Sequence, residues 1–148
     1  MGAEREGQRL VFGGVLLLGL ALLTGAVIPH FTNPRMGLAA HVTGIEAALV
    51  LAVFGLLWSR LELGERAIRA AYVSNLAGLY ALWIAFVFGA ALGTGRATPI
   101  AGAGFVGPLW AEAVFSALLY AGVLGSLVGT LLVLLGLGRA LRGRTGHR

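Results

Sequence analysis

The sequence predicts an all-α integral membrane protein, a bundle of four spanning helices with both termini in the cytoplasm. Of its 148 residues, 58% are hydrophobic and 11% are charged, and the mean hydropathy is +0.90. Apolar runs of about 20 residues recur, which is the length that crosses about 30 Å of hydrocarbon as a helix. The polar segments between these runs are too short to fold alone, so residues 1–148 are expected to form one membrane domain.

The first two spans are separated by a turn that contains two prolines. We expect the first span at about residues 10–28, after a polar segment with two glutamates and two arginines. A cleaved signal peptide also begins basic and turns apolar, but this run is longer than a usual signal core and has no convincing cleavage site, so we expect it to be retained. Pro29 and Pro34 break the helix, and the second span follows at about residues 37–58.

The last two spans enclose a loop rich in glycine and alanine. A short charged turn leads to the third span at about residues 67–92, and the loop follows at 93–108 with Pro99 and Pro108 as breakers. The fourth span, at about 109–137, is longer than crossing requires, so we expect one of its ends to reach the interface or water.

Small residues recur on the spans at the spacing of one helical turn, as at Ala40, Gly44 and Ala48. Such stripes let backbones approach closely in lipid, where helix association has no hydrophobic driving force. Because four short spans enclose little volume, we expect some stripes to face other subunits.

Composition excludes several classes of site and partner. The chain has no cysteine, which excludes disulfides, thiolate metal sites and cysteine nucleophiles. It contains no phosphate-binding glycine loop and no Ser/His/Asp set. The pI near 11.1 could suggest nucleic acid, but the arginines lie at helix ends, where membrane topology explains them. We therefore expect membrane lipid as a partner and no nucleic acid.

Two histidines flank the turn between the first two spans. His41 lies one turn inside the second span, where a neutral imidazole in apolar surroundings can ligate haem iron or another metal. The alternative is a histidine near the headgroups that is hydrogen-bonded to a carbonyl or water. His30 lies in the turn itself and is better explained as a residue at the mouth of the site. Since no second histidine stands at the spacing of a zinc site, a porphyrin with one axial ligand is the more natural guest.

Few other polar side chains fall within the spans. Glu46, in the second span, is costly there unless it is protonated, paired or facing a cavity, so it is a candidate catalytic residue. Asn75 and Tyr80 are further inward-facing candidates on the third span. Arg35 could hold a carboxylate at the mouth, or it could serve topology alone. Glu112 is explained by its place at a helix N-terminus, where the macrodipole favours negative charge.

The run from Asn33 to His41 reads Asn-Pro-Arg-Met-Gly-Leu-Ala-Ala-His, and Tyr80 begins the run Tyr-Ala-Leu-Trp. With these runs the chain resembles the hydroxylaminobenzene mutase family, which is similar to the bacterial styrene oxide isomerases. Further matching positions lie between Leu56 and Ala67. The resemblance covers roughly residues 22–90, and the Asn33-to-His41 run is its specific part.

The resemblance implies a membrane isomerase that holds ferric haem b between the subunits of a homotrimer. It implies that His41 is the axial ligand and that Tyr80 helps to position the substrate, whereas Arg35 could hold a haem propionate or serve topology alone. Iron in this family acts as a Lewis acid that polarises a substrate oxygen. Styrene oxide isomerases open an aryl epoxide to an aldehyde, and the mutases convert an aryl hydroxylamine to an aminophenol. A small apolar aromatic substrate is therefore expected.

Two stretches of the chain depart from the family pattern. The family follows its histidine with Leu-Glu-Gly and then an asparagine, whereas this chain has Val42, Thr43 and Gly44, and then Ile45 and Glu46. The asparagine of the family's Tyr-Ala-Asn-Trp run is replaced by leucine here. We expect the haem scaffold to be retained more closely than the family's choice of substrate.

Our functional prediction is a multi-pass isomerase or mutase of the inner (plasma) membrane, with haem b iron bound by His41. One alternative is a haem-binding membrane protein without catalysis on the same scaffold. The other is a small membrane subunit or channel without a cofactor, whose polar residues only pack.

The arginines predict the orientation. Nine lie in the N-terminal segment, in the turn between the second and third spans, and in the C-terminal tail, whereas two, Arg35 and Arg96, lie on the other side. The positive-inside rule then places both termini in the cytoplasm. Fusions of alkaline phosphatase after Arg148 and within the 93–108 loop should be active only in the loop. An inactive loop fusion beside a stable, active C-terminal fusion would contradict this orientation.

Overall fold

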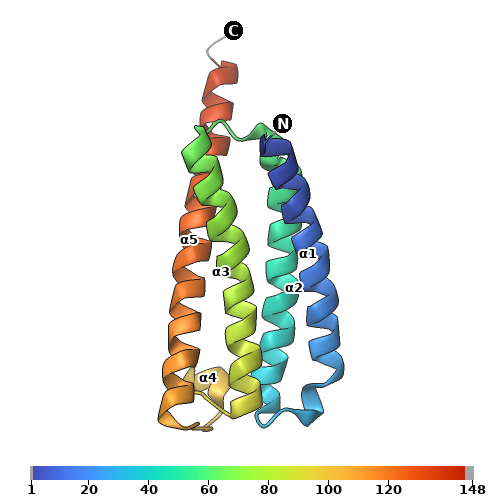
Figure 1. The fold of residues 1–148 in the computed structure, drawn as a ribbon, viewed down its shortest axis with the longest axis vertical. Coiled ribbons are helices and arrows are strands. Elements are labelled where there is room, and N and C mark those ends of the chain that lie inside the picture. Colours follow the sequence, from blue (N-terminus) through green and yellow to red (C-terminus); the bar gives the residue numbers. More distant parts are fainter. Residues whose placement is uncertain (1, 146–148) are drawn as a thin grey trace.

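A computed structural model describes residues 2–145 of the chain, which form helices joined by short connections (Figure 1). The long helices are α1 (Gly2–Ala26), α2 (Pro34–Leu57), α3 (Glu65–Leu92) and α5 (Leu109–Thr145). The short ones are η1 (Ile28–His30), η2 (Trp58–Arg60) and α4 (Pro99–Gly102). The described residues contain no strand. Arg148, which we counted in the basic tail, lies outside them.

The prediction of an all-α bundle with four spanning helices is confirmed. Each long helix is long and apolar enough to cross a membrane. The helices alternate in direction, so the start of α1 and the end of α5 lie at the same end of the bundle, and α4 lies at the other (Figure 1). We refer to these as the terminal end and the α4 end.

Three helices extend further than the apolar runs. The helix α1 begins at Gly2, eight residues before the predicted start, and α5 continues to Thr145 through the basic tail. Glutamate and arginine are good helix formers, so a helix continues into water where hydropathy alone ends a span. The helix α2 begins at Pro34 because proline suits the first position of a helix.

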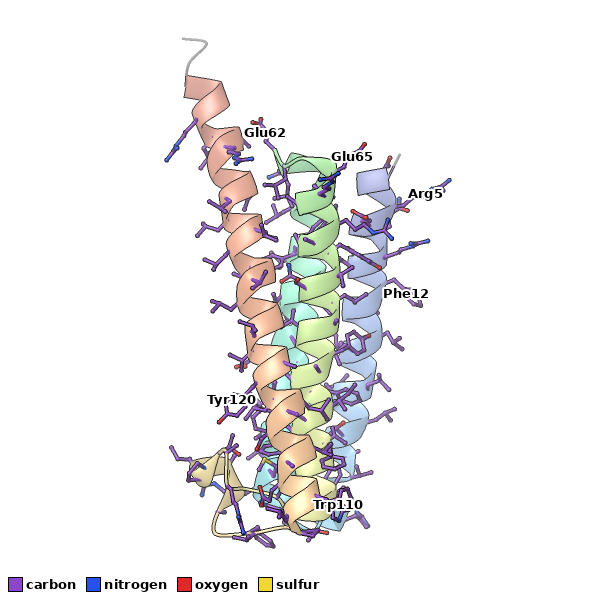
Figure 2. The ribbon with its side chains drawn as sticks, turned by 60° about the vertical axis from the view of Figure 1, so that its left-hand side comes forward. Arg5, Phe12, Glu62, Glu65, Trp110 and Tyr120 are labelled. Carbon is purple, nitrogen blue, oxygen red and sulfur yellow. The ribbon has the colours of Figure 1, made fainter. Side chains whose placement is uncertain are left out.

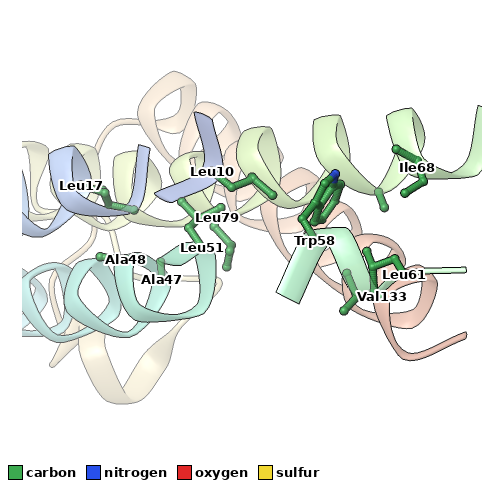
Figure 3. Packing of buried hydrophobic residues seen from close by; sticks show 11 residues of the cluster. Leu10, Leu17, Ala47, Ala48, Leu51, Trp58, Leu61, Ile68, Leu79 and Val133 are labelled. Atoms are coloured by element: carbon green, nitrogen blue, oxygen red, sulfur yellow. The ribbon is translucent and has the colours of Figure 1, made fainter. Parts of the chain in front are cut away.

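Apolar side chains join the helices in two clusters. In sequence, α1 packs on α2, α2 on α3, and α3 on α5. The larger cluster draws on all four helices and is shown in Figure 3; its main members are Leu10, Leu17, Ala47, Ala48, Leu51, Trp58, Leu61, Ile68, Leu79 and Val133. The second lies nearer the α4 end and contains Met36, Ala85, Ala90, Phe115 and Leu119. Many large apolar side chains remain exposed outside these clusters, as suits a surface in hydrocarbon.

The small-residue stripe of α2 packs inside the protomer and not against another subunit. A Cβ on Gly44 would lie 2.6 Å from the Cβ of Ala21 and 2.7 Å from Cδ1 of Trp83, so this turn touches both α1 and α3. Gly78 on α3 similarly leaves room for α5, because a Cβ there would lie 2.5 Å from the backbone nitrogen of Ser126. These contacts are the close backbone approaches that join helices in lipid.

One buried carboxylate organises the connection between α3 and α5. Glu112 lies in the first turn of α5 and is 4% exposed. Its Oε1 accepts hydrogen bonds from the backbone nitrogens of Gly95 and Gly107, both at 3.0 Å, and its Oε2 accepts one from Arg96 at 3.2 Å. Glu112 therefore fixes the path of the connection, in addition to complementing the helix dipole as the sequence predicted.

Replacing Glu112 by alanine should destabilise this end of the bundle. The change leaves three backbone donors without their acceptor, and each such buried group costs about 1–3 kcal/mol. We expect a lower unfolding temperature in detergent and faster proteolysis within residues 93–108. Glu65→Ala is the matched control, since Glu65 is an exposed glutamate in the first turn of α3. Equal melting and proteolysis of the two variants would contradict this role.

Candidate functional site

The start of α2 is anchored by Asn33. This side chain is fully buried, and its Oδ1 accepts a hydrogen bond from the backbone nitrogen of Met36 at 3.1 Å, as a helix N-cap does. Its Nδ2 donates to the carbonyl of Gly102 at 2.9 Å, and its backbone nitrogen donates to Ala90 at 3.0 Å. Asn33 thus joins α2, α3 and α4. From the sequence we used Asn33 only as the start of the family run, although Asn before Pro is a helix-start signal.

His41 is oriented by a hydrogen bond to the neighbouring helix. Its Nδ1 lies 2.8 Å from the carbonyl oxygen of Ala21 on α1. A carbonyl oxygen only accepts, so Nδ1 carries the proton and Nε2 carries the lone pair of the neutral ring. Nε2 makes no hydrogen bond with residues 2–145, and the His41 side chain is partly exposed. The lone pair therefore opens onto the surface of the protomer.

Gly25 makes room for this ring on α1. A Cβ at Gly25 would lie 2.6 Å from Nδ1 of His41 and 2.7 Å from its Cε1. Any larger residue would push the imidazole away from the carbonyl of Ala21. The orientation of the His41 ring is therefore determined by Ala21 and Gly25, which lie one turn apart on α1.

Arg35 and Glu46 lie on the outward side of α2. Both side chains are exposed. Arg35 lines a shallow groove of about 300 Å³ with Leu38, Val42 and, from α4, Ile100. Glu46 lies about one turn beyond Val42 along the same side of the helix. An exposed arginine at the mouth of an apolar groove can hold a carboxylate.

Tyr80 and Asn75 hold different places on α3. The hydroxyl of Tyr80 donates to the carbonyl of Gly13 on α1 at 2.8 Å, and its ring lines an apolar groove of about 460 Å³ between α1 and α3. Asn75 is fully buried and packs against Gly129 of α5. Its Nδ2 donates to Ala71 at 2.9 Å, and its Oδ1 has no partner among the described residues.

A single protomer does not bring these candidates into one site. His41 binds the carbonyl of Ala21 and Tyr80 binds that of Gly13, and eight residues span about 12 Å along a helix. Glu46 lies about 140° around α2 from His41 and about 7.5 Å further along it. Asn75 faces α5, away from His41. His41 and Arg35 lie in the half of the bundle nearest α4, and Tyr80, Glu46 and Asn75 lie apart from them.

Sequence reasoning assigned no role to Trp83, which packs beside this region. Its Nε1 is buried without a partner among the described residues, and its ring contacts Gly44 one turn beyond His41. The Tyr-Ala-Leu-Trp run was the signal that could have drawn attention to it. Within residues 2–145, no three histidine, aspartate or glutamate side chains group as metal ligands. A porphyrin iron requires only one such ligand from the protein.

Comparison with known proteins identifies similar enzymes. The profile of a family described as styrene oxide isomerase matches residues 6–138. Hydroxylaminobenzene mutase HabB of Ectopseudomonas oleovorans is 37% identical over 131 residues, which cover 88% of this chain and 80% of that protein. Hydroxylaminobenzene mutase HabA of the same organism is 38% identical over 93 residues, covering 62% and 69%. No solved structure matches.

The geometry predicts the tautomer of His41. In haem-free protein labelled with ¹⁵N-histidine, the His41 signal should be that of a ring protonated at Nδ1. Gly25→Ala should shift this signal, because its methyl group occupies the position of the ring. Gly19→Ala is the control, since the space around Gly19 on the same helix is open. An Nε2-protonated His41 in the unaltered protein would contradict the assigned hydrogen bond.

Proposed function

The chain belongs to the styrene oxide isomerase family, and we propose that it rearranges an aryl hydroxylamine to an aminophenol with haem b bound through His41. Family membership places the protein among the isomerases. The observation that carries the haem proposal is the lone pair of His41 Nε2, which opens onto the protomer surface while Nδ1 is bound to the carbonyl of Ala21.

The surroundings of His41 fit an axial ligand. Metal-binding histidines commonly donate their other ring proton to a backbone carbonyl, which fixes the ring and raises its basicity. The hydrogen bond to Ala21 has this form, and the small residue at Gly25 keeps the ring in contact with α1. Haem b, when bound, supplies an iron that acts as a Lewis acid on the substrate oxygen.

Other residues of the chain would bind and orient the haem and the substrate. Arg35, exposed beside an apolar groove, would hold a propionate carboxylate by a charge-assisted hydrogen bond. Once a neighbouring copy covers His41, water would be excluded from the site, which strengthens electrostatic interactions at the reacting oxygen. Tyr80 donates a hydrogen bond to the carbonyl of Gly13, and its oxygen lone pairs remain to accept one from a substrate N–H or O–H group. Because Tyr80 and His41 contact α1 about 12 Å apart, this role requires the substrate to bind between two copies of the chain.

A closed site requires more than one copy of the chain. His41 Nε2, Arg35 and Glu46 all open onto the surface of the protomer, so we propose that a neighbouring subunit covers them. From the resemblance to the family, we propose that three copies form a homotrimer. We propose that it lies in the inner membrane, where lipid surrounds it and apolar aromatic substrates concentrate.

The names of the relatives favour the hydroxylamine substrate. Both matched proteins are hydroxylaminobenzene mutases, whereas the family description favours a second candidate reaction, the opening of an aryl epoxide to an aldehyde. Either reaction is an isomerisation with no net oxidation or reduction. In the hydroxylamine, the N–O bond and a ring C–H bond break while a C–O bond and an N–H bond form; in the epoxide, one C–O bond breaks and a hydride moves to the neighbouring carbon. Thr43, Glu46 and Leu82 differ from the family pattern. We therefore expect this chain to differ from its relatives most in the substituents that the aromatic ring of its substrate carries.

Turnover tests the proposed reaction. Protein purified in detergent should convert phenylhydroxylamine to an aminophenol of the same mass without any electron donor. Styrene oxide, assayed in parallel, tests the second candidate. A haem-loaded, correctly assembled protein that converts neither compound would contradict the proposed function.

Substitution of the two histidines tests the ligand. His41→Ala should remove most of the haem, since it deletes the only proposed axial donor, and turnover should fall with it. His30→Ala is the control, because His30 is exposed in η1 and should leave the haem content unchanged. The measurement is the haem-to-protein ratio of each variant, with oligomer size checked so that misfolding is not mistaken for ligand loss. A haem-replete His41→Ala protein would refute the ligand assignment.

A further inference from the structure

Glu46 presents a carboxyl group on the outer surface of the protomer near the middle of a spanning helix. It lies 12 residues after the start of α2 at Pro34, which is about 18 Å along a helix of 24 residues. Its side chain is exposed and makes no hydrogen bond or ion pair with residues 2–145. A carboxyl group is costly in hydrocarbon unless a partner or a wet cavity receives it. A hydrogen-bonding partner from outside the protomer would remove this cost, whether the carboxyl group is charged or protonated.

Tyr120 is a complementary group on the far side of the bundle. Its side chain is 64% exposed and projects from α5 away from the other helices (Figure 2). Its hydroxyl also has no partner within the described part of the chain. A tyrosine hydroxyl donates and accepts hydrogen bonds, and it usually finds a partner when it leaves water. A carboxyl group and a phenol can satisfy each other.

The two side chains lie at similar depth. Gly44 on α2 contacts Trp83 on α3, and a Cβ on Gly122 of α5 would lie 2.8 Å from the backbone nitrogen of Leu82, so these positions share one level of the bundle. Glu46 is two residues beyond Gly44, and Tyr120 is two residues before Gly122. Since α2 and α5 run in the same direction, the two differ by about 6 Å along the membrane normal, roughly one helical turn.

We propose that the outward face of α2 packs against α5 of a neighbouring copy, where the Glu46 carboxyl group hydrogen-bonds to the hydroxyl of Tyr120. The two groups lie on different faces of the same protomer, so the contact is heterologous and is repeated around a closed ring. The similar depth permits this contact, because rotation about the membrane normal moves a residue without changing its depth. This proposal does not depend on haem or on the substrate.

Cross-linking tests the pair, and the chain offers a clean background because it has no cysteine. A paired glutamate and tyrosine keep their Cβ atoms further apart than the roughly 3.5–4.5 Å of a disulfide. A short bifunctional thiol reagent is therefore applied to Glu46→Cys and Tyr120→Cys chains that carry different tags and are co-expressed in membranes. We expect a cross-linked product that contains both tags.

A matched control tests whether depth in the membrane decides the cross-linking. Leu134 lies 14 residues after Tyr120 on nearly the same face of α5 and is 63% exposed, but it is about 21 Å closer to the terminal end. Glu46→Cys with Leu134→Cys should give little heterodimer. Equal yields from the two pairs would overturn the proposal. Efficient linking of Glu46→Cys to itself would also overturn it, since α2 would then face a symmetry axis.

A second measurement retains the native glutamate in case the cysteine variants do not assemble. A photoreactive benzoylphenylalanine replaces Tyr120, which preserves an aromatic ring at that position. After irradiation, the cross-linked dimer should contain the tryptic peptide of residues 36–60, which includes Glu46. Attachment to lipid alone, or to a peptide of α1 or α5, would show that α5 does not cover this face of α2.

Discussion

Close backbone approach is the constraint from which the rest of this protomer follows. Apolar side chains gain little by leaving lipid for the protein, so helices join where small residues let their backbones meet. Gly44 admits α1 and α3 to the same turn of α2, and Gly78 admits α5 to α3. A small residue also shapes the candidate site. Because position 25 is glycine, the ring of His41 lies against α1, and the Nδ1 of His41 lies 2.8 Å from the Ala21 carbonyl oxygen.

Two buried polar side chains hold the α4 end, where the backbone leaves its helices. Asn33 and Glu112 satisfy carbonyls and amides of the connection between α3 and α5, and Asn33 also caps α2. Buried backbone groups require such partners, above all where hydrocarbon excludes water. Because Asn33 begins the helix that carries His41, the anchoring of this end also determines where the candidate ligand lies.

Hydropathy was sufficient to predict the four spans, because crossing a membrane imposes a length and a composition. Helix ends were predicted less well: the charged residues before Leu10 and after Leu137 continue as helix in water. The bond from His41 to Ala21 joins residues 20 apart, and no local pattern encodes it. The outward position of Glu46 was likewise missed, since sequence identifies a polar residue in a span but not the side of the bundle it faces.

The account depends on His41 presenting its Nε2 lone pair to a ligand outside the protomer. The absorption spectrum of the unaltered protein, purified in mild detergent without added cofactor, tests this most directly. We predict a Soret band that shifts on reduction with dithionite, with haem approaching one per chain by the pyridine haemochrome assay. A colourless protein that still isomerises its substrate would contradict the account, because His41 would then have no iron to bind.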